Sequence, residues 1–258
     1  MADGQAIHAP AVISNAGVFN TFGPLLPDNA PHKAFYQNKL GQVQRSMASV
    51  CLYIGLQDTA ENLALPKTNF WIYPGADYRG QVENFLAAPD SHDIPLTYIS
   101  FPSAKDPSFA ERYPGRATIE IVAPGPFEWY QDWADQPWGK RGQDYEAKKD
   151  AYAQRLLEKL YEKMPHLRGK VDYYELSTPL STDYFCRYST GEIYGLDHTP
   201  ERFEQDWLKP KTRLPGLYLT GQDIMTCGVV GAMIGGLLTT VAVSGLKGLP
   251  LAKKMFVG

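Results

Sequence analysis

A run of 23 residues without a charged side chain, Ile224 to Leu246, restricts the possible folds of this chain more than any other segment. The run is long enough to cross a bilayer, and Gly231 and Gly235 have the Gly-x-x-x-Gly spacing found where membrane helices pack together. It is also rich in glycine and threonine, which makes it weakly hydrophobic for a lone membrane span. An ordinary buried helix is a second interpretation, which explains the apolar character but not the glycines at the start.

A third interpretation also uses the residues that precede the run. Residues 217–220 are typical of a buried strand, Gly221 is typical of a turn, and Asp223 then supplies a carboxylate just beyond the strand. A helix that starts at residues 227–231 would present unpaired N–H groups, and its glycines would let a flat ligand approach the backbone. This pattern indicates a site for an electron-rich ring edge, with the carboxylate accepting hydrogen bonds from a sugar-alcohol chain.

Shorter segments elsewhere predict strands and one long helix. Residues 11–17 are a short apolar run that stops at small turn-forming residues, as a strand does when it enters a loop. Four further runs, rich in aromatic and β-branched residues and bounded by turn-forming residues, are 49–56, 69–73, 96–101 and 117–122. Because no long helical pattern separates them, we expect an antiparallel sheet. Apolar residues spaced by three, four and seven predict an amphipathic helix over 144–164, which Pro165 ends.

Composition and motifs exclude several classes of protein. With 44% hydrophobic and 21% charged residues the chain is expected to fold, and a formal charge of -3 disfavours nucleic acid as a partner. Three widely spaced cysteines and five histidines without ligand spacing predict a reduced, cytoplasmic chain without a metal site. Neither the Gly-x-Ser-x-Gly of hydrolases nor a phosphate-binding P-loop occurs in the sequence.

The carboxyl-terminal pattern also carries a specific resemblance. Residues 217–223 (LYLTGQD) and 226–232 (TCGVVGA) resemble the carboxyl-terminal flavin-binding motif of the FAD-dependent phytoene desaturase and carotenoid isomerase superfamily. Within that superfamily the all-trans-retinol 13,14-reductase (retinol saturase) branch is the most similar. The stretches that support this resemblance are 69–74, 98–107, 175–182 and 191–200.

The resemblance implies an α/β fold in which an antiparallel-sheet substrate domain is inserted into a Rossmann-like FAD-binding domain. We expect residues 1–45 and 179–258 to belong to the FAD-binding domain, and 46–178, with its helix at 144–164, to form the substrate domain. The substrate class would be a conjugated polyene, which is reduced, desaturated or isomerised by hydride transfer with FAD, and NAD(P)H is a candidate electron donor. The resemblance assigns Asp223 to the ribityl or phosphate part of FAD. It places the backbone of Gly228, Val229 and Val230 against the isoalloxazine ring. Gly221 and Gly231 would permit the close approach of the cofactor to the chain.

One part of the family pattern is missing from this sequence. The Gly-x-Gly-x-x-Gly turn that holds the FAD pyrophosphate does not occur, because no two glycines are separated by a single residue. We therefore expect the chain to correspond to the carboxyl-terminal portion of a complete enzyme and to need an amino-terminal FAD-binding half as partner. Without that half, the strands at 11–15 and 217–220 should have exposed edges, and FAD binding should be weak or absent.

Candidate catalytic residues are few, since the cofactor supplies most of the reactivity. Tyr194 and His198 are suitable proton donors, although a core-packed Tyr194 and a structural hydrogen bond of His198 with Asp197 in a turn explain them more simply. The aromatic loop 124–138 could line a polyene tunnel or pack against the sheet. The tail 246–256 mixes apolar and basic residues and could lie on an anionic membrane surface.

Two other functions fit the same sequence. One is a lipid-binding or interaction module that lacks the dinucleotide-binding half and has no catalytic activity. The other is a flavin amine oxidase-like enzyme, which the resemblance through the substrate domain disfavours.

Overall fold

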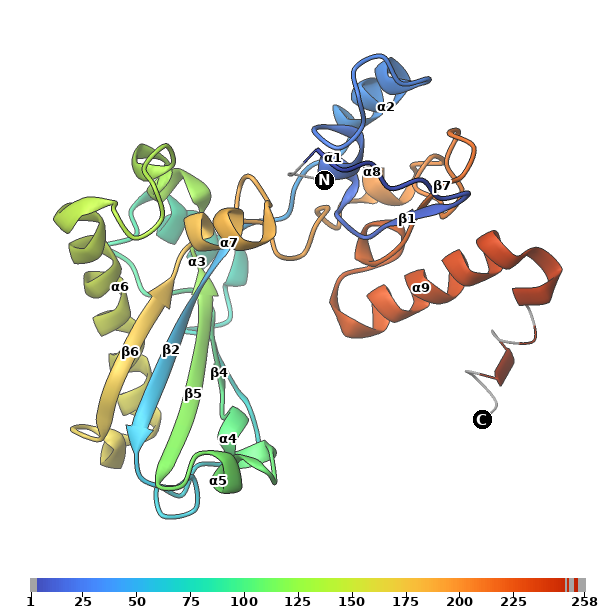
Figure 1. The fold of residues 1–258 in the computed structure, drawn as a ribbon. Helices are drawn as coiled ribbons and strands as arrows, with labels where there is room; N and C mark the ends of the chain where they lie inside the picture. The colour runs from blue at the N-terminus through green and yellow to red at the C-terminus, as the bar shows by residue number, and fades with distance from the viewer. Residues whose placement is uncertain (1–3, 249, 251–252, 255–258) are drawn as a thin grey trace. The chain divides into compact units, whose positions relative to one another are not determined.

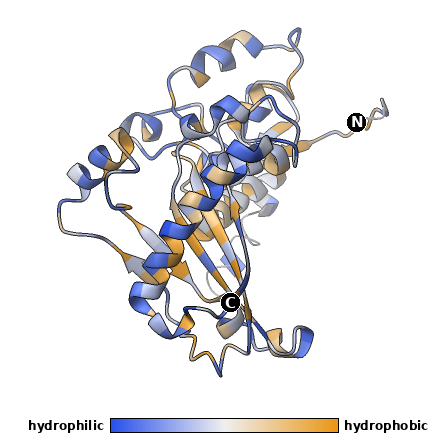
Figure 2. Ribbon diagram, turned by 90° about the vertical axis from the view of Figure 1, so that its left-hand side faces the viewer, coloured by the Kyte–Doolittle hydropathy of each residue, from blue (hydrophilic) through white to orange (hydrophobic). Residues whose placement is uncertain are grey.

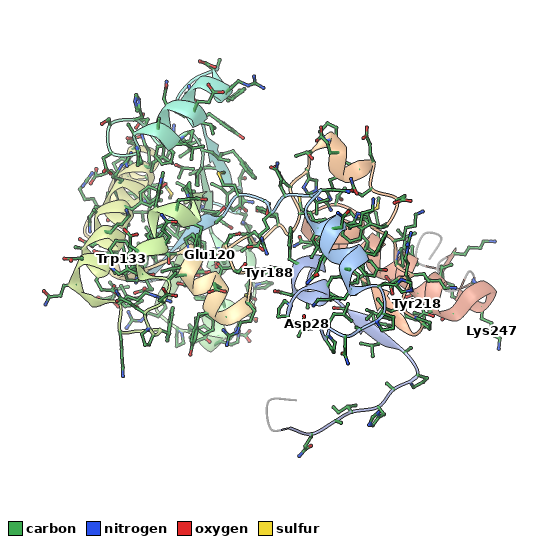
Figure 3. All side chains as sticks on the ribbon, turned by 90° about the horizontal axis from the view of Figure 1, so that it is seen from above. Asp28, Glu120, Trp133, Tyr188, Tyr218 and Lys247 are labelled. Atoms are coloured by element: carbon green, nitrogen blue, oxygen red, sulfur yellow. The ribbon has the colours of Figure 1, made fainter. Side chains whose placement is uncertain are left out.

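A computed structural model describes residues 4–248, 250 and 253–254 and divides the chain into two compact units. Unit 1 contains Met1–Ser46 and Tyr194–Gly258, and unit 2 contains Met47–Ile193. The first boundary lies one residue from the expected one. The second differs, since residues 179–193 group with the sheet unit rather than with the carboxyl-terminal segment, because Leu180 is part of the sheet's hydrophobic core. Figure 3 labels Glu120 and Trp133 in unit 2, and Asp28 and Tyr218 in unit 1.

Unit 2 is built on a five-stranded antiparallel sheet (Figure 1). Its spatial order is β3-β4-β5-β2-β6. The strands are β2 (Ser49–Gln57), β3 (Phe70–Ile72), β4 (Thr97–Ser100), β5 (Arg116–Pro124) and β6 (Val171–Ser177). The four strands expected from the sequence and their antiparallel pairing are confirmed, whereas β6 was not expected.

Alternating burial along the strands fixes which face of the sheet is covered. In β2, Val50, Leu52, Ile54 and Leu56 are buried, and β5 buries alternate residues in the same way. These side chains form one core with helix α6 (Gly142–Lys163), the amphipathic helix predicted at 144–164. In Figure 2 the strands are coloured mainly as hydrophobic, while hydrophilic residues recur along the helices. The residues between the buried ones lie on the opposite face, which has exposed aromatic side chains at Tyr53 and Tyr173.

Shorter helices connect the strands of unit 2. Helix α3 (Tyr78–Ala87) lies between β3 and β4, although no helix was expected there. The remaining elements are α4 (Pro102–Lys105), α5 (Phe109–Arg112), η1 (Phe127–Trp129), η2 (Gln131–Trp133), η3 (Pro165–Leu167) and α7 (Pro179–Cys186). The aromatic loop that contains η1 and η2 packs on the core through Trp129, Tyr130 and Trp133, whereas Trp138 remains 42% exposed.

Unit 1 contains a parallel pair of strands, β1 (Val12–Ser14) and β7 (Leu217–Leu219), with Ile13 opposite Tyr218. Its helical elements are α1 (Val18–Phe22), α2 (Lys33–Leu40), α8 (Pro200–Phe203), η4 (Gln222–Ile224), α9 (Gly228–Ser244) and η5 (Gly245–Gly248). Their core centres on the stacked rings of Phe22 and Tyr36, whose centroids are 3.7 Å apart. The two strands that the sequence predicted are therefore present as one small sheet.

The outer edge of β1 is open, as expected from the sequence, whereas the exposed edge expected for 217–220 is wrong, because residues 210–212 pair with the outer side of β7. Val12 and Ser14 direct main-chain hydrogen bonds toward the β7 segment, with Val12 N–H donating to Gly216 and the Ser14 carbonyl accepting from Thr220. In a parallel pair the groups of the intervening residue, Ile13, then point away from β7. Among the described residues none bonds to them, and Val12 and Ile13 are each 53% exposed.

Most of the charge-free run, Gly228–Ser244, forms helix α9, which is 17 residues long. Within the described ranges, no helix combines the length and hydropathy required to cross a membrane. The second interpretation from the sequence, an ordinary buried helix, does not describe α9 either, since Val229, Val230 and Met233 are more than half exposed. The expected membrane-contacting tail, 246–256, includes 249, 251–252 and 255–256, which lie outside the described residues.

Leu156 on α6 is fully buried in the sheet core, so Leu156→Ala should lower the free energy of unfolding by about 2–5 kcal/mol through lost burial and a residual cavity. Leu86→Ala on α3 is the matched control, because that leucine is 38% exposed; it should cost about 1 kcal/mol or less. Urea denaturation followed by circular dichroism measures both. Equal losses would contradict the core described here.

Candidate functional site at the start of the carboxyl-terminal helix

The turn after β7 requires glycine at its first position. Gly221 has φ 91°, and a Cβ on it would overlap the Asn15 side-chain oxygen. Asn15 follows β1, so the chain segments that leave the two parallel strands meet here. Gly221 therefore allows close contact between two loops at the carboxyl ends of β1 and β7.

Asp223 joins those loops through its carboxylate. One oxygen accepts from the Val18 main-chain N–H at 2.8 Å and the other from the Leu196 N–H at 3.1 Å. The residue is 6% exposed, and Val18 is the first residue of α1. A buried carboxylate at a helix start is stabilised by these N–H donors and by the positive end of the helix. Asp223 thus lies just beyond the strand, as predicted, and its two oxygens bind main-chain N–H groups.

Arg202, a buried cation, binds the same loop as the Asp223 carboxylate. It is 3% exposed and donates to the carbonyl oxygens of Leu196 at 2.9 Å, Gln222 at 2.8 Å and Met225 at 3.1 Å. Burial lowers the pKa of Arg202 from its ordinary value, while the Asp223 carboxylate acts in the opposite direction. Sequence reasoning did not identify this residue, because the targets are main-chain carbonyls, which leave no side-chain motif.

His198 holds the residue that precedes α9. Its Nε2 accepts a hydrogen bond from the Cys227 N–H at 2.9 Å, so the imidazole is bound in its neutral form. Burial lowers the pKa of His198 below its ordinary value of 6.5, and the Arg202 guanidinium lowers it further. The hydrogen bond with Asp197 that was considered from the sequence is present, since the His198 main-chain N–H donates to the Asp197 carboxylate at 2.8 Å, whereas the imidazole ring binds the Cys227 N–H.

The start of α9 is open. A Cβ built on Gly228, where φ is +85°, would meet nothing within 4 Å, and Val229 and Val230 are 86% and 65% exposed. No side chain caps the helix, and among the described residues no acceptor binds the N–H groups of these three residues. Bulky side chains do not block this helix start, so a flat ligand can approach it and its N–H groups can donate hydrogen bonds to the acceptors of that ligand.

Two other glycines, Gly231 and Gly235, allow backbone segments within unit 1 to pack closely together. A Cβ on Gly231 would overlap the Thr226 carbonyl oxygen, and a Cβ on Gly235 would overlap that of Gly221. Thr239, one turn further, donates to the Leu219 carbonyl at 2.8 Å. Close contact at Gly221 and Gly231 is thus made by the protein's own loop, whereas Gly228 faces open space.

Of the two catalytic candidates only His198 contacts the start of α9. Tyr194 is 44% exposed, and the structure describes no hydrogen bond of its hydroxyl. Within the described residues there is also no group of three or more side chains arranged to hold a metal ion. The site is therefore a helix start positioned by Asp223, Arg202 and His198.

The sequence is similar to those of several reductases and desaturases, although no protein-family model matches it. The all-trans-retinol 13,14-reductase of Macaca fascicularis is 38% identical over 92% of the chain and 40% of its own length. The inactive all-trans-retinol 13,14-reductase of Danio rerio is 31% identical over 90% of the chain and 39% of its own length. The lycopene-forming phytoene desaturase of a Paracoccus species is 25% identical over 94% of the chain and 46% of its own length.

These matches identify the chain as a homologue of reductases and desaturases. In particular, it is homologous to the all-trans-retinol 13,14-reductases at 37–38% identity, which confirms the resemblance seen in the sequence. The chain spans about two fifths of the length of the reductases that it matches.

Asp223→Asn replaces one acceptor oxygen by an NH2 group that faces a main-chain N–H donor. The free energy of unfolding should fall by about 1–3 kcal/mol, since a buried N–H loses its charged partner. Asp206→Asn, at an exposed position of the same unit, is the control and should change little. Urea titrations of the three proteins decide the matter, and equal stability of Asp223→Asn and the parent chain would contradict the described role.

The lowered pKa of His198 makes stability depend on pH. The unfolded chain takes up this proton near pH 6.5 and the folded chain only at lower pH, so stability should be complete above pH 6.5 and decrease below it. His198→Gln keeps an acceptor for the Cys227 N–H but does not titrate, and it should show a smaller decrease. Urea midpoints measured between about pH 7.5 and 5.5 test this; identical pH dependence in both proteins would exclude it.

Proposed function

We propose that this chain forms part of an FAD-dependent oxidoreductase that reduces, desaturates or isomerises a conjugated polyene such as a retinoid or carotenoid. The observation that carries the proposal is the unobstructed start of α9, directly after a strand, a glycine turn and a buried aspartate. Homology to all-trans-retinol 13,14-reductases and phytoene desaturases supports the substrate class.

The residues at this helix start fit a flavin. Gly228 leaves room against the backbone, and the N–H groups of Val229 and Val230 would face the electron-rich edge of the isoalloxazine ring. Bound FAD would supply hydride acceptance or donation. The chain's own contribution would be to orient the ring through these amides and, through the His198–Cys227 hydrogen bond, to keep the helix start in place.

Asp223 would act on the flavin mainly by positioning. Because both carboxylate oxygens accept from main-chain N–H groups, a contact with the ribityl chain would have to share those oxygens. A carboxylate has about four acceptor positions, so such sharing is chemically reasonable. Val18 and Leu196, whose N–H groups it binds, bring the loop after β1 and residues 195–196 to the same point.

The open edge of β1 supports the proposal of an amino-terminal partner. Ile13 presents its main-chain N–H and C=O to that edge, and a strand of another segment would complete the parallel sheet. We infer that the Rossmann-like FAD-binding domain is completed by this additional polypeptide, which would also supply the pyrophosphate contacts. NAD(P)H as electron donor and contact with a membrane surface are further parts of the proposal.

A binding module without catalysis is the second candidate, and the similarity to a reductase named inactive favours it. The two functions differ in one measurable property. Retinoid binding by the chain together with its amino-terminal partner, without any flavin binding, would favour the module.

Flavin binding should depend on co-expression. The chain alone should bind FAD weakly or not at all, whereas co-expression with the amino-terminal portion of a reductase relative should give a protein with yellow flavin absorbance. One equivalent of FAD and reductase turnover in the chain alone would contradict the need for a partner.

Val229→Glu should weaken FAD binding in the co-expressed assembly about tenfold, because a carboxylate at the helix start competes for the N–H groups and repels an electron-rich ring edge. Val229→Gln is the matched control, since it has the same shape without the charge, and it should weaken binding less. Fluorescence titration of FAD measures both. Equal affinities for the two variants would remove the helix start from the flavin site.

A further inference from the structure

Arg141 in unit 2 is a buried cation at the beginning of α6. The residue is 7% exposed and directly precedes the helix. Its guanidinium carbon lies 5.6 Å from the centre of the Trp138 ring and 5.3 Å from that of Tyr145. Both aromatic rings lie within the distance at which a cation is attracted to a π face.

Arg141 makes fewer hydrogen bonds than a buried arginine needs. One N–H group reaches the Leu180 carbonyl at 3.4 Å, and the buried Nε has no partner. No carboxylate among the described residues forms an ion pair with it. Arginine remains charged in proteins, and a buried charge without an anion is costly. Aromatic faces alone leave its planar donors without acceptors.

A second arginine on α6 shows the usual arrangement. Arg155 also lies over two aromatic rings, at 5.8 Å from Phe85 and 5.7 Å from Tyr152. Unlike Arg141, it donates to the Pro89 carbonyl at 2.7 Å and to the His92 carbonyl at 2.6 Å. The difference between the two arginines is therefore the missing acceptors of Arg141, and not its aromatic contacts.

An open pocket of about 400 Å³ is lined by Trp138, whose ring the Arg141 guanidinium faces, and by residues of α7. Trp138, Phe185 and Ile193 give it an apolar wall, and Ser181 and Thr182 follow Leu180, whose carbonyl Arg141 contacts. The one acidic lining residue, Glu175, is paired with Lys149. A ligand in this pocket would thus meet an apolar surface, and the uncompensated Arg141 cation contacts one residue of that surface, Trp138, and the carbonyl of Leu180, which precedes another, Ser181.

We propose that this pocket and Arg141 together form a binding site for a carboxylate carried on an apolar chain. The carboxylate binds the free N–H groups of Arg141, and the chain lies against Trp138 and Phe185. A carboxylate matches the planar guanidinium with two parallel hydrogen bonds, and its charge offsets the buried cation. The site lies within unit 2 and does not rest on the proposed flavin chemistry.

Decanoate and 1-decanol, added to the full chain without flavin, test the site, with Arg141→Met and Arg155→Met as the variant pair. Decanoate should raise the melting temperature of the parent chain and of Arg155→Met, whereas 1-decanol should have a smaller effect. Binding of decanoate measured by calorimetry should weaken about tenfold or more in Arg141→Met, because a charge-assisted contact is lost.

Stability without ligand gives an independent measure. Arg141→Met should leave the melting temperature unchanged or raise it, since it removes an unpaired buried charge, whereas Arg155→Met should lower it. The proposal is overturned if decanoate does not stabilise the parent chain, or if it stabilises Arg141→Met equally. A loss of stability in Arg141→Met as large as that in Arg155→Met would likewise assign Arg141 to structural support alone.

Discussion

The organisation of unit 1 depends on the Asp223 carboxylate. This single buried group binds the Val18 N–H at the start of α1 and the Leu196 N–H on a distant segment, while Arg202 binds the carbonyls of the loop that carries it. Buried main-chain groups that lack partners are costly, so these bonds determine where the loops after β1 and β7 lie. The position of α9, which starts five residues later, follows from that loop.

Glycine determines which surfaces in this region are filled and which are open. Gly221, Gly231 and Gly235 allow backbone segments to touch, and a side chain on any of them would overlap a neighbouring oxygen. Gly228 differs, because it faces open space at the helix start. The same segment thus combines tight internal packing with a row of N–H donors that no side chain caps, an arrangement suited to a flat ligand that carries hydrogen-bond acceptors.

The sequence was most informative where side chains alternate regularly. The period of two in β2 and β5 and the helical period over 144–164 reflect burial on one face, so these elements could be predicted. In β6 only Leu176 is buried, and in α3 only Phe85, so neither element has a clear pattern.

The internal bonds of the site could not be predicted in the same way. Asp223 and Val18 are 205 positions apart, and the group that Asp223 binds is a main-chain N–H, which any residue would supply. Arg202 likewise binds carbonyls that have no side-chain signature. The position of Asp223 beyond the strand and the open helix start followed from the order strand, glycine, carboxylate and glycine-rich helix.

Hydrogen–deuterium exchange of the co-expressed assembly, with and without FAD, tests the central claim most directly. If the start of α9 contacts the flavin, the amides of Gly228 to Gly231 should exchange more slowly when FAD is bound, while those near the end of α9 should change little. Unchanged exchange at Gly228 to Gly231 in an assembly that binds FAD would contradict this account.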